Sequence, residues 1–153
     1  MTRAPDGVLG DPDLVLVPGG GWNDRGGAYQ QAERGDIPRA LAERHARGRR
    51  IGSVCTGAML LAAAGILKGR PAITHHTALD DLRAAGADVR EGARVVDDGD
   101  VLTAAGVTSG IDLALHIVER QCGTAVRDEV ADEIEWTQSS GASASGRSIE
   151  TNA

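Results

Sequence analysis

Residues 51–65, IGSVCTGAMLLAAAG, predict a buried strand that leads directly into a helix. Residues 51–54 (IGSV) have side chains that are either apolar or small, which suits a parallel strand covered on both faces. Residues 56–64 have a helical composition, and Gly65 fits the left-handed position that ends many helices. A strand followed at once by a helix is typical of a parallel sheet covered by helices, so this stretch favours an α/β fold.

The turn between that strand and that helix carries a candidate nucleophile, Cys55. Ser53-Val54-Cys55-Thr56-Gly57 places a small residue two positions before and two positions after the cysteine, which is the pattern of a nucleophile elbow. Such an elbow strains the backbone of the nucleophile, and the small residues allow strand and helix to approach. The helix dipole would favour the thiolate, and the N–H of Thr56 would face developing negative charge. A lone cysteine is more often a packing residue, but this context favours a nucleophile.

Two glycine-containing loops are expected near this turn. Residues 13–17 (DLVLV) form an apolar strand that is stopped by Pro18-Gly19-Gly20-Gly21. Ligands of doubly wound sheets bind beyond the carboxyl ends of the strands, so the N–H of Gly20 or Gly21 is a candidate oxyanion donor. Gly106, after the strand at residues 101–105, is a further candidate at the same edge, although the sequence favours a plain turn glycine at this position.

Two adjacent histidines also follow a predicted strand. His75 and His76 come directly after residues 72–74, so both are expected at the edge that carries Cys55. One of them would orient or activate the thiol, as in other cysteine–histidine pairs. Neighbouring side chains on an extended segment point in opposite directions, so the sequence predicts that at most one of the two faces the pocket.

The rest of the chain continues the alternation of strands and helices. Helices are predicted after Asp36 to about residue 47, and at residues 78–85, 109–120 and 125–136; a hairpin is predicted about Asp97-Asp98-Gly99-Asp100. This order implies a mostly parallel sheet with helices on both faces. We expect one domain over residues 1–138, with an irregular lead-in at residues 1–12 and a disordered tail at residues 139–153.

Composition and charge exclude several classes of function. The formal net charge of −6 leaves no basic surface for nucleic acid. No apolar run approaches the roughly 20 residues that a membrane span needs, and the first 13 residues contain no secretory h-region, so a cytoplasmic protein is predicted. The two cysteines, Cys55 and Cys122, lack metal-ligand spacing, so no metal or cofactor is predicted. Cys122 ends a helix beside Gly123 and is expected to pack.

Three segments together resemble a known family. They are PGGG at residues 18–21, SVCTGAMLLAAAGILKGRPAITHH at residues 53–76 and VLTAAGVTSGIDLALHIVER at residues 101–120. They are similar to the ThiJ/PfpI superfamily of class I glutamine-amidotransferase-like proteins, in the branch that contains isocyanide hydratases and the sensor domains of some AraC-type regulators. The resemblance extends over residues 13–136.

This resemblance implies a flavodoxin-like three-layer α/β/α sandwich, usually a homodimer, that acts on a small molecule. It implies that Cys55 is the nucleophile, that Thr56 assists it, and that Gly20 supplies a backbone donor. Thr74 and His75 match the Thr-His pair of the family, and His76 takes the place of a common tryptophan. The Gly-Ile-Asp helix start at residues 110–112 occupies the region where amidotransferases carry His and Glu, so glutaminase activity is not expected.

The chain departs from the family pattern before residue 13. Members normally carry a strand and a helix there, with an acidic residue that hydrogen-bonds the cysteine. Only twelve residues precede Asp13, and their acidic residues, Asp6 and Asp11, match no motif. The resemblance therefore implies an N-terminally shortened sheet without that acid.

Several functions stay open at this point. Isocyanide hydration through a cysteine thioimidate fits the quoted motifs best. Glyoxalase-like chemistry is favoured less, because such relatives carry a histidine where this chain has Thr56. A redox-sensing member and a shortened, inactive member are the remaining alternatives.

Overall fold

Strands and helices alternate along the chain in the computed structural model, which describes residues 10–137. The strands are β1 (Leu14–Val17), β2 (Arg50–Val54), β3 (Pro71–Ala72), β4 (Asp88–Val89), β5 (Val95–Asp97) and β6 (Val101–Ala104). The helices are α1 (Gly27–Arg34), α2 (Asp36–Ala46), α3 (Gly57–Ala63), α4 (Leu79–Ala84), α5 (Ser109–Cys122) and α6 (Thr124–Glu133), and a 3-10 turn, η1 (His76–Ala78), precedes α4.

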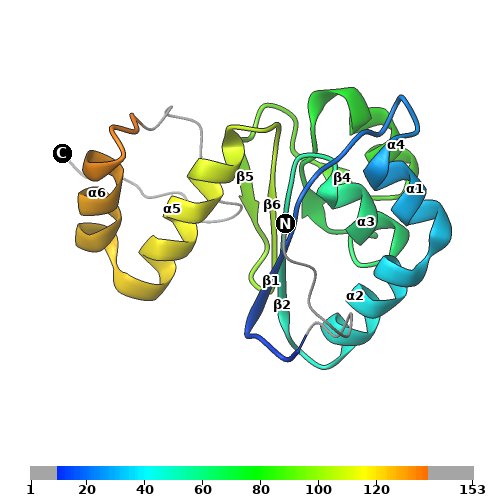
Figure 1. Ribbon diagram of the computed structural model, residues 1–153, viewed down its shortest axis with the longest axis horizontal. Coiled ribbons are helices and arrows are strands. Elements are labelled where there is room, and N and C mark those ends of the chain that lie inside the picture. Colours follow the sequence, from blue (N-terminus) through cyan, green and yellow to red (C-terminus); the bar gives the residue numbers. More distant parts are fainter. Residues whose placement is uncertain (1–9, 138–153) are drawn as a thin grey trace.

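The main sheet has the strand order β1-β2-β6-β5. β1, β2 and β6 are parallel, and β5 pairs antiparallel with β6. β3 and β4 form a separate two-stranded parallel ladder. Helices α1 to α4 lie on one side of the main sheet and α5 and α6 on the other (Figure 1). The predicted α/β sandwich with a mostly parallel sheet is therefore confirmed.

The core is aliphatic, as a chain without phenylalanine requires. On the α1–α4 side it contains the fully buried residues Ile51, Leu61, Leu67, Leu82 and Val101. A smaller cluster between the sheet and α5 contains Val95, Leu102, Ala104 and Leu113. Each buried leucine or isoleucine contributes roughly 1.5–3 kcal/mol relative to an exposed one, so these two clusters hold both helical layers to the sheet.

Several predicted boundaries need correction. Asp36 is the first residue of α2 rather than its cap, because Gly35, with φ +76°, joins α1 directly to α2. The last helix ends at Glu133, and Trp136 lies beyond it with its indole N–H donated to Asp112 Oδ1 at 3.2 Å. Cys122 does not pack: it is exposed, as are all of residues 120–126 around the turn between α5 and α6. Residues 1–9 of the predicted lead-in (residues 1–12) and the predicted tail at residues 139–153 lie outside the described residues.

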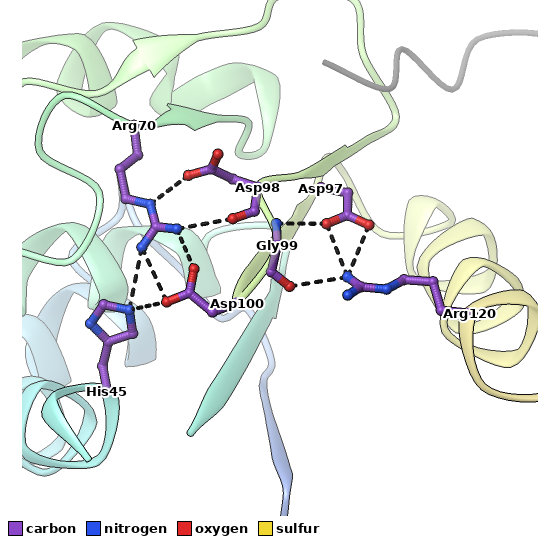
Figure 2. Close-up of polar contacts among 7 residues, drawn as sticks. All are labelled: His45, Arg70, Asp97, Asp98, Gly99, Asp100 and Arg120. Carbon is purple, nitrogen blue, oxygen red and sulfur yellow. Dashed lines mark hydrogen bonds and ion pairs between the residues drawn. The ribbon is translucent and has the colours of Figure 1, made fainter. Parts of the chain in front are cut away.

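Charged side chains anchor the predicted hairpin turn to the α1–α4 side (Figure 2). Arg70 Nε donates to Asp98 Oδ2 at 2.5 Å, and a second nitrogen of Arg70 pairs with Asp100. His45 Nε2 lies 2.7 Å from Asp100 Oδ2. The hydrogen bond from Arg70 lowers the pKa of Asp100 to about 2, so this carboxylate stays ionised in moderate acid.

The same turn is anchored to α5 on its other side. Arg120 Nη1 donates to both carboxylate oxygens of Asp97 at 3.0 Å and to the carbonyl oxygen of Gly99 at 3.1 Å (Figure 2). His116 Nε2 lies 2.6 Å from Asp97 Oδ2. The turn precedes β6 and therefore lies at the amino end of the parallel strands, opposite to the end where Cys55 follows β2.

Candidate functional site

The backbone of Cys55 adopts the strained conformation that the elbow pattern predicts. Cys55 follows β2, precedes α3, and has φ +59°, in the left-handed region that L-residues rarely adopt. Its N–H donates to the carbonyl oxygens of Ala104 and Ala105, both at 3.0 Å. Its own carbonyl oxygen accepts a hydrogen bond from Thr74 Oγ1 at 3.0 Å. These three bonds hold the turn in place against the cost of its conformation.

The end of β1 packs directly against this turn. A Cβ atom on Gly57 would lie 2.2 Å from the carbonyl oxygen of Val17, so only glycine fits there. A Cβ atom on Gly19 would lie 2.9 Å from Cys55 Cβ and 3.1 Å from Cys55 Sγ. Gly57, two positions after the cysteine, therefore makes room for the neighbouring strand β1. Gly19 is the glycine that lies beside the thiol.

Thr56 and Gly20 are bonded to each other. The N–H of Gly20 donates to Thr56 Oγ1 at 3.0 Å, and the Thr56 hydroxyl donates to the carbonyl oxygen of Gly20 at 2.5 Å. The N–H that the sequence offered as an oxyanion donor is therefore engaged by a hydroxyl that lies next to Cys55. Gly21 packs against Asp24 instead, where a Cβ would lie 2.3 Å from Asp24 Oδ1.

The Cys55 side chain lies in an apolar hollow of about 650 Å³. The hollow is lined by Leu16, Val17, Pro18, Gly19, Gly20, Val54, Cys55 and Val107. Gly21 is not among these lining residues. Cys55 is a free, half-buried thiol, and Val107 is 75% exposed at the rim. A reagent that reaches the sulfur would therefore meet mostly hydrocarbon.

His75 and His76 line a second hollow together. Their ring centroids are 4.2 Å apart, and both residues border a space of about 400 Å³. Neither of them lines the hollow of Cys55, and the alternation of an extended segment does not apply to them, because β3 ends at Ala72 and the 3-10 turn already begins at His76. The described contacts include no hydrogen bond between His75 and Cys55.

The ring of His75 is fixed by its own loop and by Gly106. Its Nδ1 lies 2.9 Å from Thr77 Oγ1 and accepts the N–H of Thr77 at 3.4 Å. Burial, followed by the charge of His76, lowers the pKa of His75 and keeps its imidazole neutral at neutral pH. A Cβ on Gly106 would lie 2.9 Å from His75 Cδ2, so this glycine provides space for the ring.

The described residues contain neither a helix that could span a membrane nor a group of side chains placed to bind a metal ion. No helix in residues 10–137 combines the length and apolarity needed to cross a bilayer. Within the same residues, no group of three or more His, Cys, Asp or Glu side chains is placed to hold a metal ion.

Known proteins with similar sequences and structures share this architecture. The model of the DJ-1/PfpI family matches residues 4–120. An isonitrile hydratase from Pseudomonas putida is 37% identical over 125 residues, which cover 81% of this chain and 52% of that protein. A Parkinson disease protein 7 homolog from Danio rerio is 34% identical over 132 residues, which cover 82% of this chain and 68% of that protein.

A solved structure of a ThiJ/PfpI family protein is also similar to this chain. The crystal structure of a ThiJ/PfpI family protein from Pseudomonas syringae superimposes with a TM-score of 0.73 at 33% identity, covering 84% of this chain and 51% of that one. The chain thus spans about half the length of the isonitrile hydratase and of this crystallised protein.

Proposed function

Because this chain belongs to the DJ-1/PfpI family, we propose that it hydrates an isocyanide to an N-substituted formamide, with Cys55 as the nucleophile. The observation that carries the proposal is the Cys55 turn: a free thiol at φ +59° that opens into an apolar hollow. An isocyanide is uncharged and largely apolar, so the lining of this hollow suits it. The 37% identity to an isonitrile hydratase supports the same reaction class.

The proposed reaction needs only the thiol and water. The Cys55 sulfur attacks the terminal carbon of the isocyanide and forms a C–S bond, and the proton given up by the thiol goes to that carbon, which yields a thioimidate. Water then adds to the carbon and a proton goes to the nitrogen. The C–S bond breaks, the sulfur leaves with its electron pair and is reprotonated, and the formamide is released.

The other site residues would position this chemistry. Thr56 ties the Gly20 loop to the turn through two hydrogen bonds, which keeps the wall of the hollow in place beside the sulfur. Gly19 lets that wall approach the sulfur closely. No described hydrogen bond joins His75 to the thiol, and its Nδ1 is engaged by Thr77, so this proposal gives His75 a binding role rather than that of the base.

Formamide production with a matched pair of variants tests the proposal. Wild type, Cys55→Ala and Cys122→Ala would be incubated with an alkyl isocyanide, and the formamide measured by mass spectrometry in ¹⁸O-labelled water. We expect labelled formamide from wild type and from Cys122→Ala, whose thiol is exposed at the far end of α5. Formamide production that does not depend on Cys55, or none at all, would overturn the proposal.

Redox sensing by Cys55 is the second candidate, because its thiol is free and partly accessible. Mild peroxide would then convert Cys55, but not Cys122, to sulfenic or sulfinic acid. Mass spectrometry of both cysteine peptides separates this role from hydration. A lactate assay with methylglyoxal checks the glyoxalase-like alternative, which Thr56 in place of a histidine disfavours.

A further inference from the structure

We infer that the hollow beside His75 is a polar subsite of the Cys55 site, and that it binds a neutral hydrogen-bond acceptor, such as an ester or amide carbonyl, on the substrate. This inference rests on the proposed function and adds a substrate class to it. The reactive carbon would lie in the apolar hollow at Cys55, and the carbonyl oxygen would lie in the second hollow. The substrates would then be isocyanides that carry a carbonyl group.

The two hollows adjoin. Val107 lines both of them and is 75% exposed, so it forms a common rim. Thr74 and Ala105 line the second hollow and are each hydrogen-bonded to the backbone of Cys55 at 3.0 Å. One ligand of modest size can therefore occupy both spaces by lying across Val107.

The first donor of the subsite is His75 Nε2. The backbone N–H of Thr77 can only donate, so the Nδ1 atom that it reaches must be the unprotonated nitrogen of the ring. The single proton of the neutral imidazole is then on Nε2. A Cβ on Gly106 would lie 2.9 Å from Cδ2 and 3.5 Å from Nε2, so this edge of the ring lies against Gly106, which lines the hollow.

The second donor is Arg94. Its Nε and Nη2 donate to Asp112 Oδ2 at 2.7 and 2.5 Å, and Nη2 also donates to Thr108 Oγ1 at 3.1 Å. In the described part of the chain these bonds leave Nη1 available to a ligand. Because Asp112 balances the charge of Arg94, the hollow offers N–H groups without a net positive charge. A neutral acceptor fits this arrangement better than an anion does.

Two matched isocyanides would test the subsite in turnover. The kcat/KM of an isocyanoacetate ester would be divided by that of an alkyl isocyanide of equal length. One neutral hydrogen bond changes such a ratio by about fivefold. We expect wild type to prefer the ester by at least about that factor, mainly through a lower KM.

Two substitutions of His75 separate the donor from the rest of the ring. In His75→Asn the side-chain carbonyl oxygen can replace Nδ1 as the acceptor for the N–H of Thr77, but the N–H at the position of Nε2 is lost. His75→Gln instead supplies an amide N–H near the position of Nε2. We expect the ester preference to be lost in H75N and largely kept in H75Q. Equal ratios in the two variants, or a wild type without preference, would overturn the inference.

Binding to an inactive chain keeps the subsite testable if no isocyanide is turned over. The Cys55→Ala chain would be titrated with an N-formylglycine ester, its free acid and an N-alkyl formamide, and Kd values measured by NMR. Tighter binding of the ester, abolished by adding H75N, supports the subsite even if the hydratase proposal fails. Equal Kd values for ester and alkyl formamide, or tightest binding of the carboxylate, would refute it.

Discussion

Replacing Cys55 by glycine should stabilise the protein relative to replacing it by alanine. Both substitutions remove the thiol, so their difference isolates the backbone of the turn. At φ +59°, an L-residue costs roughly 1–2 kcal/mol more than glycine. Glycine loses roughly 0.5–1 kcal/mol more backbone entropy on folding, which offsets part of this gain. We therefore expect C55G to unfold with a free energy about 0.5–1 kcal/mol higher than that of C55A.

Urea unfolding followed by circular dichroism measures this difference, and equal m-values would show that the unfolded states are comparable. For a chain of this size the corresponding shift in Tm is about 1–4 °C. Ala58→Gly, inside α3 and three residues away, is the control. It should lower stability by at least about 1 kcal/mol, because its backbone is helical and its methyl group is fully buried. A C55A protein as stable as C55G would refute the claim that the turn is strained.

Three further outcomes follow from buried and charged contacts. Thr103→Val should cost about 1–3 kcal/mol in urea unfolding, because it leaves the buried N–H of Ile73 without its 3.0 Å acceptor; T103S should cost less. Gly57→Ala should cost at least about 3 kcal/mol, because its Cβ meets a β1 carbonyl oxygen at 2.2 Å, whereas Gly27→Ala, with nothing within 4 Å, should not destabilise in a thermal scan. The pKa of Asp100 is lowered to about 2, so its ionised form stabilises the fold fully above pH 3.8 and loses this effect as the pH falls toward 2. Because the side chain is 46% exposed, D100N should remove only about 1 kcal/mol of pH-dependent stability in that window.

The sequence predicted the elements whose local signals agree with their packing. The strand and helix around Cys55, and the hairpin about Gly99, combine apolar runs with glycines at positions that have positive φ. It did not predict α1, because a single glycine, Gly35, connects this helix to α2 and leaves no loop signal. Strands of two residues, such as β4, carry too little pattern to be recognised.

The sequence predicted which loops form the candidate site but not the contacts between their individual atoms. The rule that parallel strands present their carboxyl ends at one edge was enough to place Cys55, the glycine loop and His75 in one region. Three consecutive glycines look alike in sequence, so nothing indicated that Gly19 would lie against the sulfur. The tautomer of His75 depends on the N–H of Thr77, which a 3-10 turn brings to the ring. Such contacts follow from the backbone path rather than from residue type.

The charged hairpin turn and the Cys55 turn lie at opposite ends of the same strands, β2 and β6. Arg70 and Arg120 bind the turn at residues 97–100 from both helical layers, so strand register is secured far from the two hollows. Substitutions at rim positions such as Val107 therefore leave this anchor untouched. For evolution, or for a protein engineer, this separation means that the residues lining the two hollows can change while the scaffold remains folded.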